Sequence, residues 1–361
     1  MTPHPPTDIP IFDGHNDLLL HIAQLPPDSD WSFLSENETA SIDLPRALKG
    51  NLVGGIFAIF TPPLGEKPTE DDIERTGDGG YAFPLVPALP FETARQFTVD
   101  TMEILADLER QSDGEFAVIR DIDALRSRFA DQKMSAVLHF EGAEAIDEDL
   151  ELLSDYYDAG LRSLGIVWSR PNAFGHGVPF RYPCSPDTGP GLTEAGRRLV
   201  RACNEMGILL DLAHLNEAGF WDVAGLSTHP LVVSHACCHA ICPSARNLTD
   251  RQIDAIGESN GLVGINFFVG DLREDGRFLA DTPVDVIVDH IDYVADRVGI
   301  DHVGFGSDFD GALVPSDIGD ATGLPRLVDA LRRRGYDEAA LRKVAGENWL
   351  RVLEASWKPC C

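Results

Sequence analysis

The stretch IPIFDGHND, residues 9–17, places an imidazole and a carboxylate directly after a short apolar run. His15 and Asp17 stand two residues apart at the end of this run. Side chains two apart in a strand point to the same face, about 6.5 Å from each other along it. If the run is a strand, His15 and Asp17 can therefore reach one metal ion together.

Seven further apolar runs follow along the chain, and all eight share one character. They are short, nearly continuous and often β-branched, which is typical of strands buried on both faces. The eight runs are residues 9–17, 51–60, 134–142, 161–168, 207–214, 230–236, 261–268 and 302–311. Amphipathic helix patterns lie between and after them, at 93–111, 193–207, 283–299 and 337–355. This alternation predicts an α/β fold, a parallel (β/α)8 TIM barrel, with a doubly wound open sheet as the alternative.

The length of 361 residues fits a single catalytic barrel domain over residues 1–361. Two long loops are unlike the rest: residues 61–92 are rich in Pro, Gly and acidic residues, and residues 169–192 in Pro and Gly. Both follow strands on the same side of the predicted barrel. Loops of this length are usually functional or act as lids.

The formal charge of -30 argues against nucleic acid and anionic membranes as partners, because the field of the protein repels them. No apolar stretch approaches the roughly 20 residues needed to span a bilayer. The N-terminal residues MTPHPPTDIP lack the pattern of a secretory signal. The seven cysteines are an odd number and do not suggest a disulfide framework. We therefore expect a cytoplasmic protein.

Polar residues gather at the C-terminal ends of the predicted strands. In a barrel these ends converge on one mouth, where active sites are built. The residues are His15, Asp17, His139, Glu141, His214, Ser234, His235, Asn266, Asp308 and Asp310.

This set contains enough imidazole and carboxylate ligands, with a bridging carboxylate, for a binuclear metal site at the barrel mouth. Nitrogen and oxygen ligands without thiolate favour zinc, with manganese, iron or cobalt as alternatives. Such metals activate water and polarise a carbonyl, which is the chemistry of amide hydrolysis. We interpret His139 as a structural residue and Asp310 as a supporting or turn residue. Cys237, Cys238 and Cys242 lack a paired CxxC spacing, so we expect buried or loop thiols there.

At these residues the sequence resembles the membrane (renal) dipeptidase family, the M19 metallopeptidases of the amidohydrolase superfamily. The resemblance covers nearly the whole chain, and its motifs are specific in combination. They are DGHND at 13–17, FEG at 140–142, DLAH at 211–214, SHA at 234–236, ARNLTD at 245–250, GSDFDG at 306–311 and GENWLRVL at 346–353.

The resemblance implies a (β/α)8 barrel with two zinc ions per chain and a role for each matching residue. His15 and Asp17 would bind one zinc, Glu141 would bridge both, and His214 and His235 would bind the second. Asp308 would lie at the first zinc, both as a further metal contact and as general acid/base, and Glu141 would be the second catalytic residue. Arg246 would hold the terminal carboxylate of the substrate, a task that suits a guanidinium, and Asn247 beside it would orient that loop and so support substrate binding. The family also suggests a homodimer.

The sequence departs from the family pattern after the fourth strand. The animal dipeptidases carry a histidine there that contacts the substrate, and in GIVWSRPNAFGHG Trp168 stands at that position. The WSRPNAFG form is similar to a bacterial branch of the family. Trp168 either packs on the substrate or walls the pocket, since an indole can donate one hydrogen bond but cannot accept a proton. His176 in the following loop is an alternative, although we interpret it as a surface residue.

The predicted function is hydrolysis of a dipeptide, including one with a C-terminal D-residue. One alternative is another metal-dependent amidohydrolase reaction, such as deacylation of an N-acyl amino acid. A second is a metal-binding barrel without catalytic activity.

Overall fold

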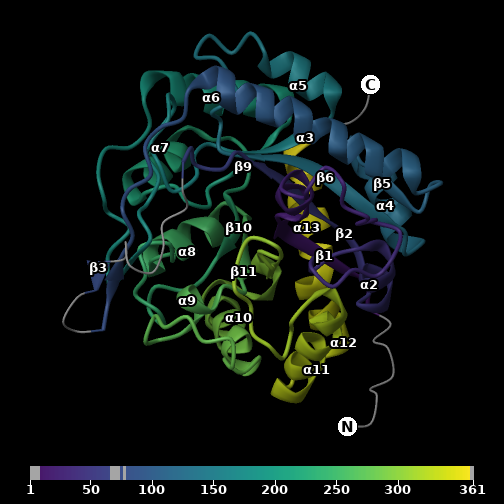
Figure 1. Cartoon of the computed structure of the whole chain (residues 1–361). Helices are drawn as coiled ribbons and strands as arrows, with labels where there is room; N and C mark the ends of the chain where they lie inside the picture. Colours follow the sequence, from purple (N-terminus) through teal and green to yellow (C-terminus); the bar gives the residue numbers. More distant parts are fainter. Residues whose placement is uncertain (1–8, 66–73, 76–78, 358–361) are drawn as a thin grey trace.

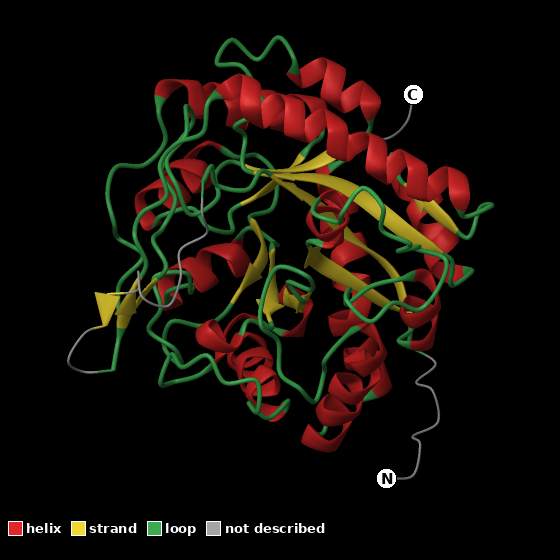
Figure 2. Ribbon diagram, viewed as in Figure 1, coloured by secondary structure: helices red, strands yellow, loops and turns green. Residues whose placement is uncertain are grey.

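The computed structural model describes residues 9–65, 74–75 and 79–357 (Figure 1). Eight parallel strands close into a barrel, and helices surround it (Figure 2). Around the ring the strands are β1 (Ile11–Asn16), β2 (Leu52–Phe60), β6 (Met134–Glu141), β7 (Leu161–Gly165), β9 (Leu209–Asp211), β10 (Val232–Ala236), β11 (Leu262–Asn266) and β12 (Val303–Gly306). Because β2 pairs with both β1 and β6, the ring is closed. The predicted (β/α)8 barrel is confirmed, each of the eight apolar runs contains one of these strands, and the open sheet is excluded.

The helices alternate with the strands, and several begin at a polar side chain that caps the first turn. Asp43, Asp121, Thr193, Asn216 and Asp337 each accept a hydrogen bond from a backbone N–H three residues later. The helices are α1 (Leu18–Ala23), α2 (Leu44–Lys49), α3 (Phe91–Gln111), α4 (Ile122–Ala130), α5 (Leu153–Ala159), α6 (Glu194–Met206), α7 (Glu217–Leu226), α8 (Asp250–Glu258), α9 (Val269–Leu272), α10 (Asp285–Val298), α11 (Leu324–Arg334), α12 (Glu338–Arg342) and α13 (Asn348–Ser356). None of the helices in the described part of the chain is long and apolar enough to cross a membrane.

The C-terminal helix differs from the single helix predicted over 337–355. A π-helical turn at Lys343–Glu347 separates α12 from α13. Gly346 lies in this turn, and a Cβ there would come within 2.6 Å of the Phe129 ring. A ninth strand that the sequence did not indicate, β5 (Phe116–Val118), pairs with the start of β6 outside the ring.

The two long loops meet in a small antiparallel sheet. It consists of β3 (Glu74–Arg75) and β4 (Tyr81–Ala82) from the first loop and β8 (Arg181–Tyr182) from the second. Tyr81 of β4 pairs with Tyr182 of β8. Figure 1 shows this sheet to one side of the barrel. The two loops are therefore held together at the side of the molecule where the strands β2 and β7 end.

Trp349 of α13 fills one end of the barrel. It is fully buried in a cluster that includes the first or second residues of β1, β2, β9, β10 and β11. Its indole nitrogen donates a hydrogen bond to the carbonyl oxygen of Phe305 at 2.9 Å. A Cβ at Gly14 would overlap the Trp349 ring, and one at Gly264 would approach it to 3.0 Å. Glycines in the strands thus make room for the indole, and the opposite end of the barrel is left for the polar residues.

Candidate active site

The C-terminal ends of the barrel strands bring the five predicted zinc ligands into one cluster. Each of them is at most 5% exposed. They are His15 in β1, Asp17 directly after it, Glu141 at the end of β6, His214 three residues after β9, and His235 in β10. Residues from four different strands therefore meet at the barrel mouth, as the sequence predicted.

Glu141 lies between two groups of ligand atoms. Its Oε2 is 3.8 Å from His15 Nε2, which is itself 3.6 Å from Asp17 Oδ2. Its Oε1 is 3.0 Å from His214 Nε2 and 3.6 Å from His235 Nε2. The two oxygens of one carboxylate thus face two separate groups, which is the arrangement that a carboxylate bridging two metal ions requires.

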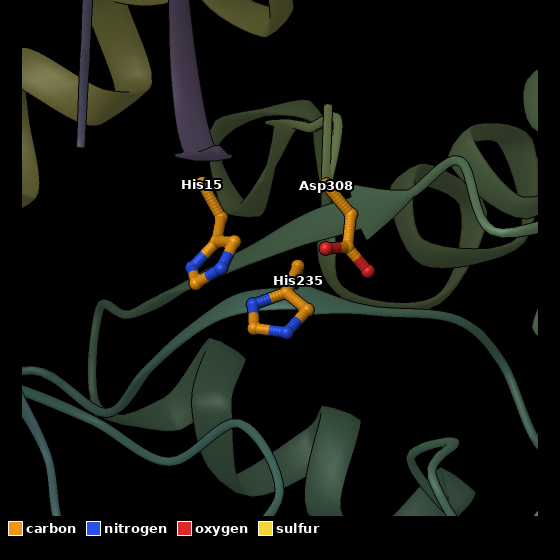
Figure 3. A group of neighbouring side chains, drawn as sticks. All are labelled: His15, His235 and Asp308. Carbon is orange, nitrogen blue, oxygen red and sulfur yellow. The ribbon is translucent and has the colours of Figure 1, made fainter. Parts of the chain in front are cut away.

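Asp308, two residues after β12, reaches the same cluster. One ligand atom each from His15, His235 and Asp308 lies within 4.8 Å of the others, and Figure 3 shows the three side chains together. Asn266 at the end of β11 donates a hydrogen bond to Asp308 Oδ2 at 3.0 Å. His214 and Asp308 have φ values of 63° and 59°. This left-handed conformation is costly for non-glycine residues and is concentrated at functional sites.

The electrostatics of the cluster favour bound cations. Burial raises the pKa of Glu141 well above its usual range, and Asp17 and Asp308 add to that shift against the charge of His15. Burial also raises the pKa of Asp308 to about 6, although His15 opposes it. Burial alone would lower the pKa of His15, but Glu141, Asp17 and Asp308 outweigh it and raise the pKa to about 10. Three carboxyl groups therefore crowd one imidazole, and additional positive charge would stabilise their ionised forms.

The donor atoms of the cluster fit divalent metal ions. Both ring nitrogens of His15 and Oδ1 of Asp17 are buried without a hydrogen-bond partner, which is costly for groups that nothing else satisfies. Burial lowers the pKa of His214 and His235 well below its usual value. Both imidazoles are therefore neutral, the form that binds a metal. Imidazole nitrogen and carboxylate oxygen suit zinc and several other transition metals.

A cavity of about 200 Å³ adjoins the cluster and is lined by Asp17, Glu141, His214 and Asp308 together with an aromatic wall. Trp168 forms the centre of that wall, with ring centroids 4.9 Å from Phe60, 5.3 Å from Phe180 and 5.7 Å from His214. The predicted position of Trp168 at the pocket wall agrees with this geometry. The volume is below the 300–1,000 Å³ typical of sites for drug-sized ligands, so the cavity suits a small substrate.

Arg246 is the single Arg or Lys among the described residues that line the cavity. It is 4% exposed, and its Nη2 donates to the carbonyl oxygen of His235 at 3.1 Å. A guanidinium has five N–H donors, so others are available to a ligand. A cation at this position can hold a carboxylate beside the metal ligands.

Two further wall residues were not predicted from the sequence. Asp271 on α9 is 1% exposed, and its Oδ1 accepts a hydrogen bond from Ser244 Oγ at 2.8 Å. Burial raises its pKa, while Arg246 opposes that shift. No spacing in the sequence relates Asp271 to the other site residues. Phe180 belongs to the Pro- and Gly-rich loop 169–192, whose composition was the one available signal.

Asn247 follows Arg246 in the chain and is held by contacts within the protein. Asn247 was predicted to support substrate binding, but it does not line the cavity. Its amide accepts from the Cys237 N–H at 3.0 Å and donates to the carbonyl oxygens of Cys242 and Asp271 at 2.9 and 2.8 Å. These contacts agree with a role for Asn247 in orienting the loop that carries Arg246, while its part in substrate binding stays a prediction.

His139 and Asp310 are held by contacts within the protein. His139 is buried, its Nδ1 lies 2.9 Å from Ser163 Oγ, and burial lowers its pKa well below the usual value. It also lies near His15, and together with Asp211 these two residues form a further buried group of possible ligands. Asp310 has a φ of 68° and accepts a hydrogen bond from the Ser41 N–H at 2.6 Å. These contacts agree with the structural interpretation of both residues.

His176 and the cysteines lie apart from the metal ligands. His176 Nδ1 is 3.2 Å from the carbonyl oxygen of Gly191, and the residue does not line the cavity. Cys237, Cys238 and Cys242 are buried, and burial raises the pKa of each thiol. Among the described residues, none of the groups that could hold a metal ion includes a cysteine.

The chain is similar in sequence and in structure to known metallopeptidases. The family model for membrane dipeptidase, peptidase family M19, matches residues 6–358. The crystal structure of dipeptidase AC, a metallopeptidase of family M19, is 49% identical and has a TM-score of 0.91, over 97% of this chain and 99% of that one.

Two further relatives have similar identity. A metallopeptidase from Rhodobacter sphaeroides, in complex with a phosphinate mimic of the dipeptide L-Ala-D-Ala, is 48% identical with a TM-score of 0.92, over 97% of this chain and 99% of that one. The "uncharacterized protein in pqqA 5'region" of Klebsiella pneumoniae is 48% identical over 66% of this chain and 87% of its own length.

Proposed function

Since the chain belongs to the membrane dipeptidase family, peptidase family M19, we propose that this metallo-dipeptidase uses two zinc ions to hydrolyse dipeptides. The observation that carries the proposal is the position of Glu141, whose two oxygens face separate groups of ligands. His15 and Asp17 would hold one ion with Glu141, and His214 and His235 the other. When bound, the ions lower the pKa of a water molecule and polarise the scissile carbonyl.

Arg246 positions the substrate in this mechanism. It would hold the C-terminal carboxylate of the dipeptide through paired hydrogen bonds, a geometry that suits a guanidinium. The cavity of about 200 Å³ leaves little room for a longer peptide. The carboxylate clamp and the small volume together select a dipeptide.

Asp308 moves the proton. It would accept a proton from the attacking water and pass it to the leaving amine, as a general base and then a general acid. Asn266 donates to Asp308 Oδ2 and so fixes the orientation of the carboxylate. The aromatic wall of Phe60, Trp168 and Phe180 excludes bulk water, which strengthens the electrostatic interactions in the site.

We propose that dipeptides with a C-terminal D-residue are among the substrates. The Rhodobacter sphaeroides relative, 48% identical, binds a phosphinate mimic of L-Ala-D-Ala. Trp168 is part of the cavity wall and contributes no proton acceptor there. Trp168 can therefore act on the substrate through packing and through its single N–H donor, so the tolerated stereochemistry would depend on how the C-terminal side chain packs against this wall.

A cytoplasmic location is part of the proposal, and a homodimer stays a prediction from the family. All five cysteines in the described part of the chain are free thiols. Reduced cysteines are typical of proteins in a reducing compartment.

The test is turnover of the zinc-loaded protein on matched substrates. The panel contains L-Xaa-L-Xaa and L-Xaa-D-Xaa dipeptides, each with a free and an amidated C-terminus, and N-acyl amino acids. We expect hydrolysis of free dipeptides of both series. Turnover confined to N-acyl amino acids would replace the dipeptidase proposal with deacylation, and bound metal without hydrolysis of any amide would favour the non-catalytic alternative.

A further inference from the structure

A chain of hydrogen bonds leads from His235 into the barrel wall. Ser234 Oγ lies 2.7 Å from His235 Nδ1 and 2.5 Å from Asp211 Oδ2. Asp211 Oδ1 also accepts from the backbone N–H groups of Ser234 at 2.7 Å and Ala213 at 3.0 Å. Ser234 is fully buried and Asp211 is 1% exposed. Neither residue lines the cavity, so neither can touch a substrate there.

The donor and acceptor of each hydrogen bond in this series follow from the group at its end, the Asp211 carboxylate. An ionised carboxylate can only accept, and three donors converge on Asp211. The single hydroxyl proton of Ser234 therefore points to Asp211, which leaves Ser234 Oγ as an acceptor. His235 Nδ1 must then carry a proton, and its Nε2, which lies 2.9 Å from His214 Nε2, carries a lone pair. Nε2 is the atom that faces Glu141 Oε1 at 3.6 Å.

We propose that Ser234 and Asp211 are positioning residues that fix the tautomer and ring orientation of His235 for metal binding. This inference rests on the proposed function, in which His235 is a zinc ligand. A metal-binding histidine becomes more basic when its other ring nitrogen is hydrogen-bonded to a group that a carboxylate supports. The loss of such a partner typically weakens metal binding by about 10–100-fold.

The other two imidazoles of the cluster are supported differently. His214 Nδ1 lies 2.7 Å from Ser169 Oγ, which has no hydrogen bond to a carboxylate within the described part of the chain. His15 Nδ1 has no hydrogen-bond partner among the described residues. The Asp211–Ser234 pair therefore supports one particular ligand, and its removal should weaken the metal held by Glu141, His214 and His235 more than the other.

The test measures zinc binding by competition with a chelating dye in the full-length protein. The variants are Ser234→Ala, which breaks the chain, and Asp211→Asn, which keeps the shape of the side chain but removes its charge. Ser112→Ala is the matched control, because Ser112 is also buried and its hydroxyl donates to the carbonyl oxygen of Phe116 at 2.9 Å, at the start of β5 outside the ring. We expect Ser234→Ala to weaken one of two zinc ions by about 10–100-fold, Asp211→Asn to weaken the same ion less, and Ser112→Ala to change neither.

A second measurement separates positioning from folding. In zinc-loaded protein labelled with 15N-histidine, the Nδ1 proton of His235 should give a protected signal that Ser234→Ala removes and Ser112→Ala retains. The thermal midpoint of the metal-free protein should change similarly in both alanine variants, because each loses one buried hydroxyl.

The outcomes distinguish the two proposals. If the wild-type protein binds no zinc, the proposal of a metal centre is wrong. If the wild type binds two zinc ions and Ser234→Ala binds both with unchanged affinity, Ser234 and Asp211 do not position His235 for metal binding. The proposed metal centre then stands. Equal weakening of zinc binding by Ser234→Ala and Ser112→Ala would also overturn the positioning role of Ser234 and Asp211, since it would show a general effect of losing a buried hydroxyl.

Discussion

Replacing Arg246 with alanine should abolish the selection of substrates by their terminal carboxylate. Arg246 is 4% exposed and is the single Arg or Lys among the described residues that line the cavity. One of its donors is used by the carbonyl oxygen of His235. The remaining donors can form a paired contact with a carboxylate, so the alanine variant loses both the charge and the paired geometry.

The expected size of this effect follows from two charge-assisted hydrogen bonds. Each is worth about 1.5–3 kcal/mol, which gives about 3–6 kcal/mol for the pair if the two add. At 1.4 kcal/mol for each factor of ten, kcat/KM for a free dipeptide should fall by roughly 10²–10⁴-fold. An amidated dipeptide cannot form the charged pair, so the same substitution should cost it on the order of tenfold or less.

The assay is a cycle of four kcat/KM values: wild type and Arg246→Ala, each with a dipeptide and with its amide. The cycle isolates the coupling between the guanidinium and the carboxylate from other effects of the substitution. Arg246→Lys keeps the charge but not the paired donors and should be intermediate. Arg198→Ala, which removes an exposed arginine outside the cavity, is the control for net charge. Zinc content is measured in each variant, because Arg246 also contacts His235.

If Arg246→Ala lowers kcat/KM by the same factor for the free and the amidated dipeptide, with zinc content unchanged, the guanidinium does not bind the carboxylate. The loss would then come from the contact between Arg246 and the carbonyl oxygen of His235.

Three other variants test separate parts of the structure. Asp308→Asn should retain its metal by elemental analysis while kcat falls by about 10²–10⁴-fold; near-normal turnover would contradict the proton-transfer role. Burial lowers the pKa of His290 from 6.5 to about 4. The folded protein therefore favours the neutral imidazole, which contributes about 3 kcal/mol to stability above pH 6.5. This contribution is lost as the pH falls toward 4. In urea unfolding of metal-free protein, the stability difference between wild type and His290→Gln should therefore shrink between pH 7 and pH 4, and a constant difference would exclude the effect. Trp349→Ala should lower the free energy of unfolding by about 3–5 kcal/mol, because it empties the closed end of the barrel; a loss below about 1 kcal/mol, by the same assay, would show that the indole does not support the closed end.

Much of the site could be predicted from local patterns. A strand buried on both faces requires a continuous apolar run, so the eight runs located the eight strands. Parallel strands in a barrel end at one mouth, so polar residues at the run ends, such as Glu141 and His235, had to meet there. The spacing of His15 and Asp17 placed both at one strand end, although Asp17 follows β1 as the N-cap residue of α1 and so does not share a strand face with His15. Local periodicity is sufficient for these conclusions, because each depends on one strand and its direction.

Other features depend on contacts between segments far apart in the sequence. The opposite orientations of the two Glu141 oxygens, the pairing of β4 with β8 that holds the two long loops together, and the approach of Asp271 to Arg246 arise only when the barrel closes. The link from Asp211 through Ser234 to His235 likewise requires the ends of β9 and β10 to lie side by side, and nothing in the periodicity of either run specifies that register. The residues that reach the barrel mouth follow from the sequence pattern, because burial dictates where the strands lie. The atoms that face one another there follow from the folded chain, because strand register and loop pairing depend on long-range packing.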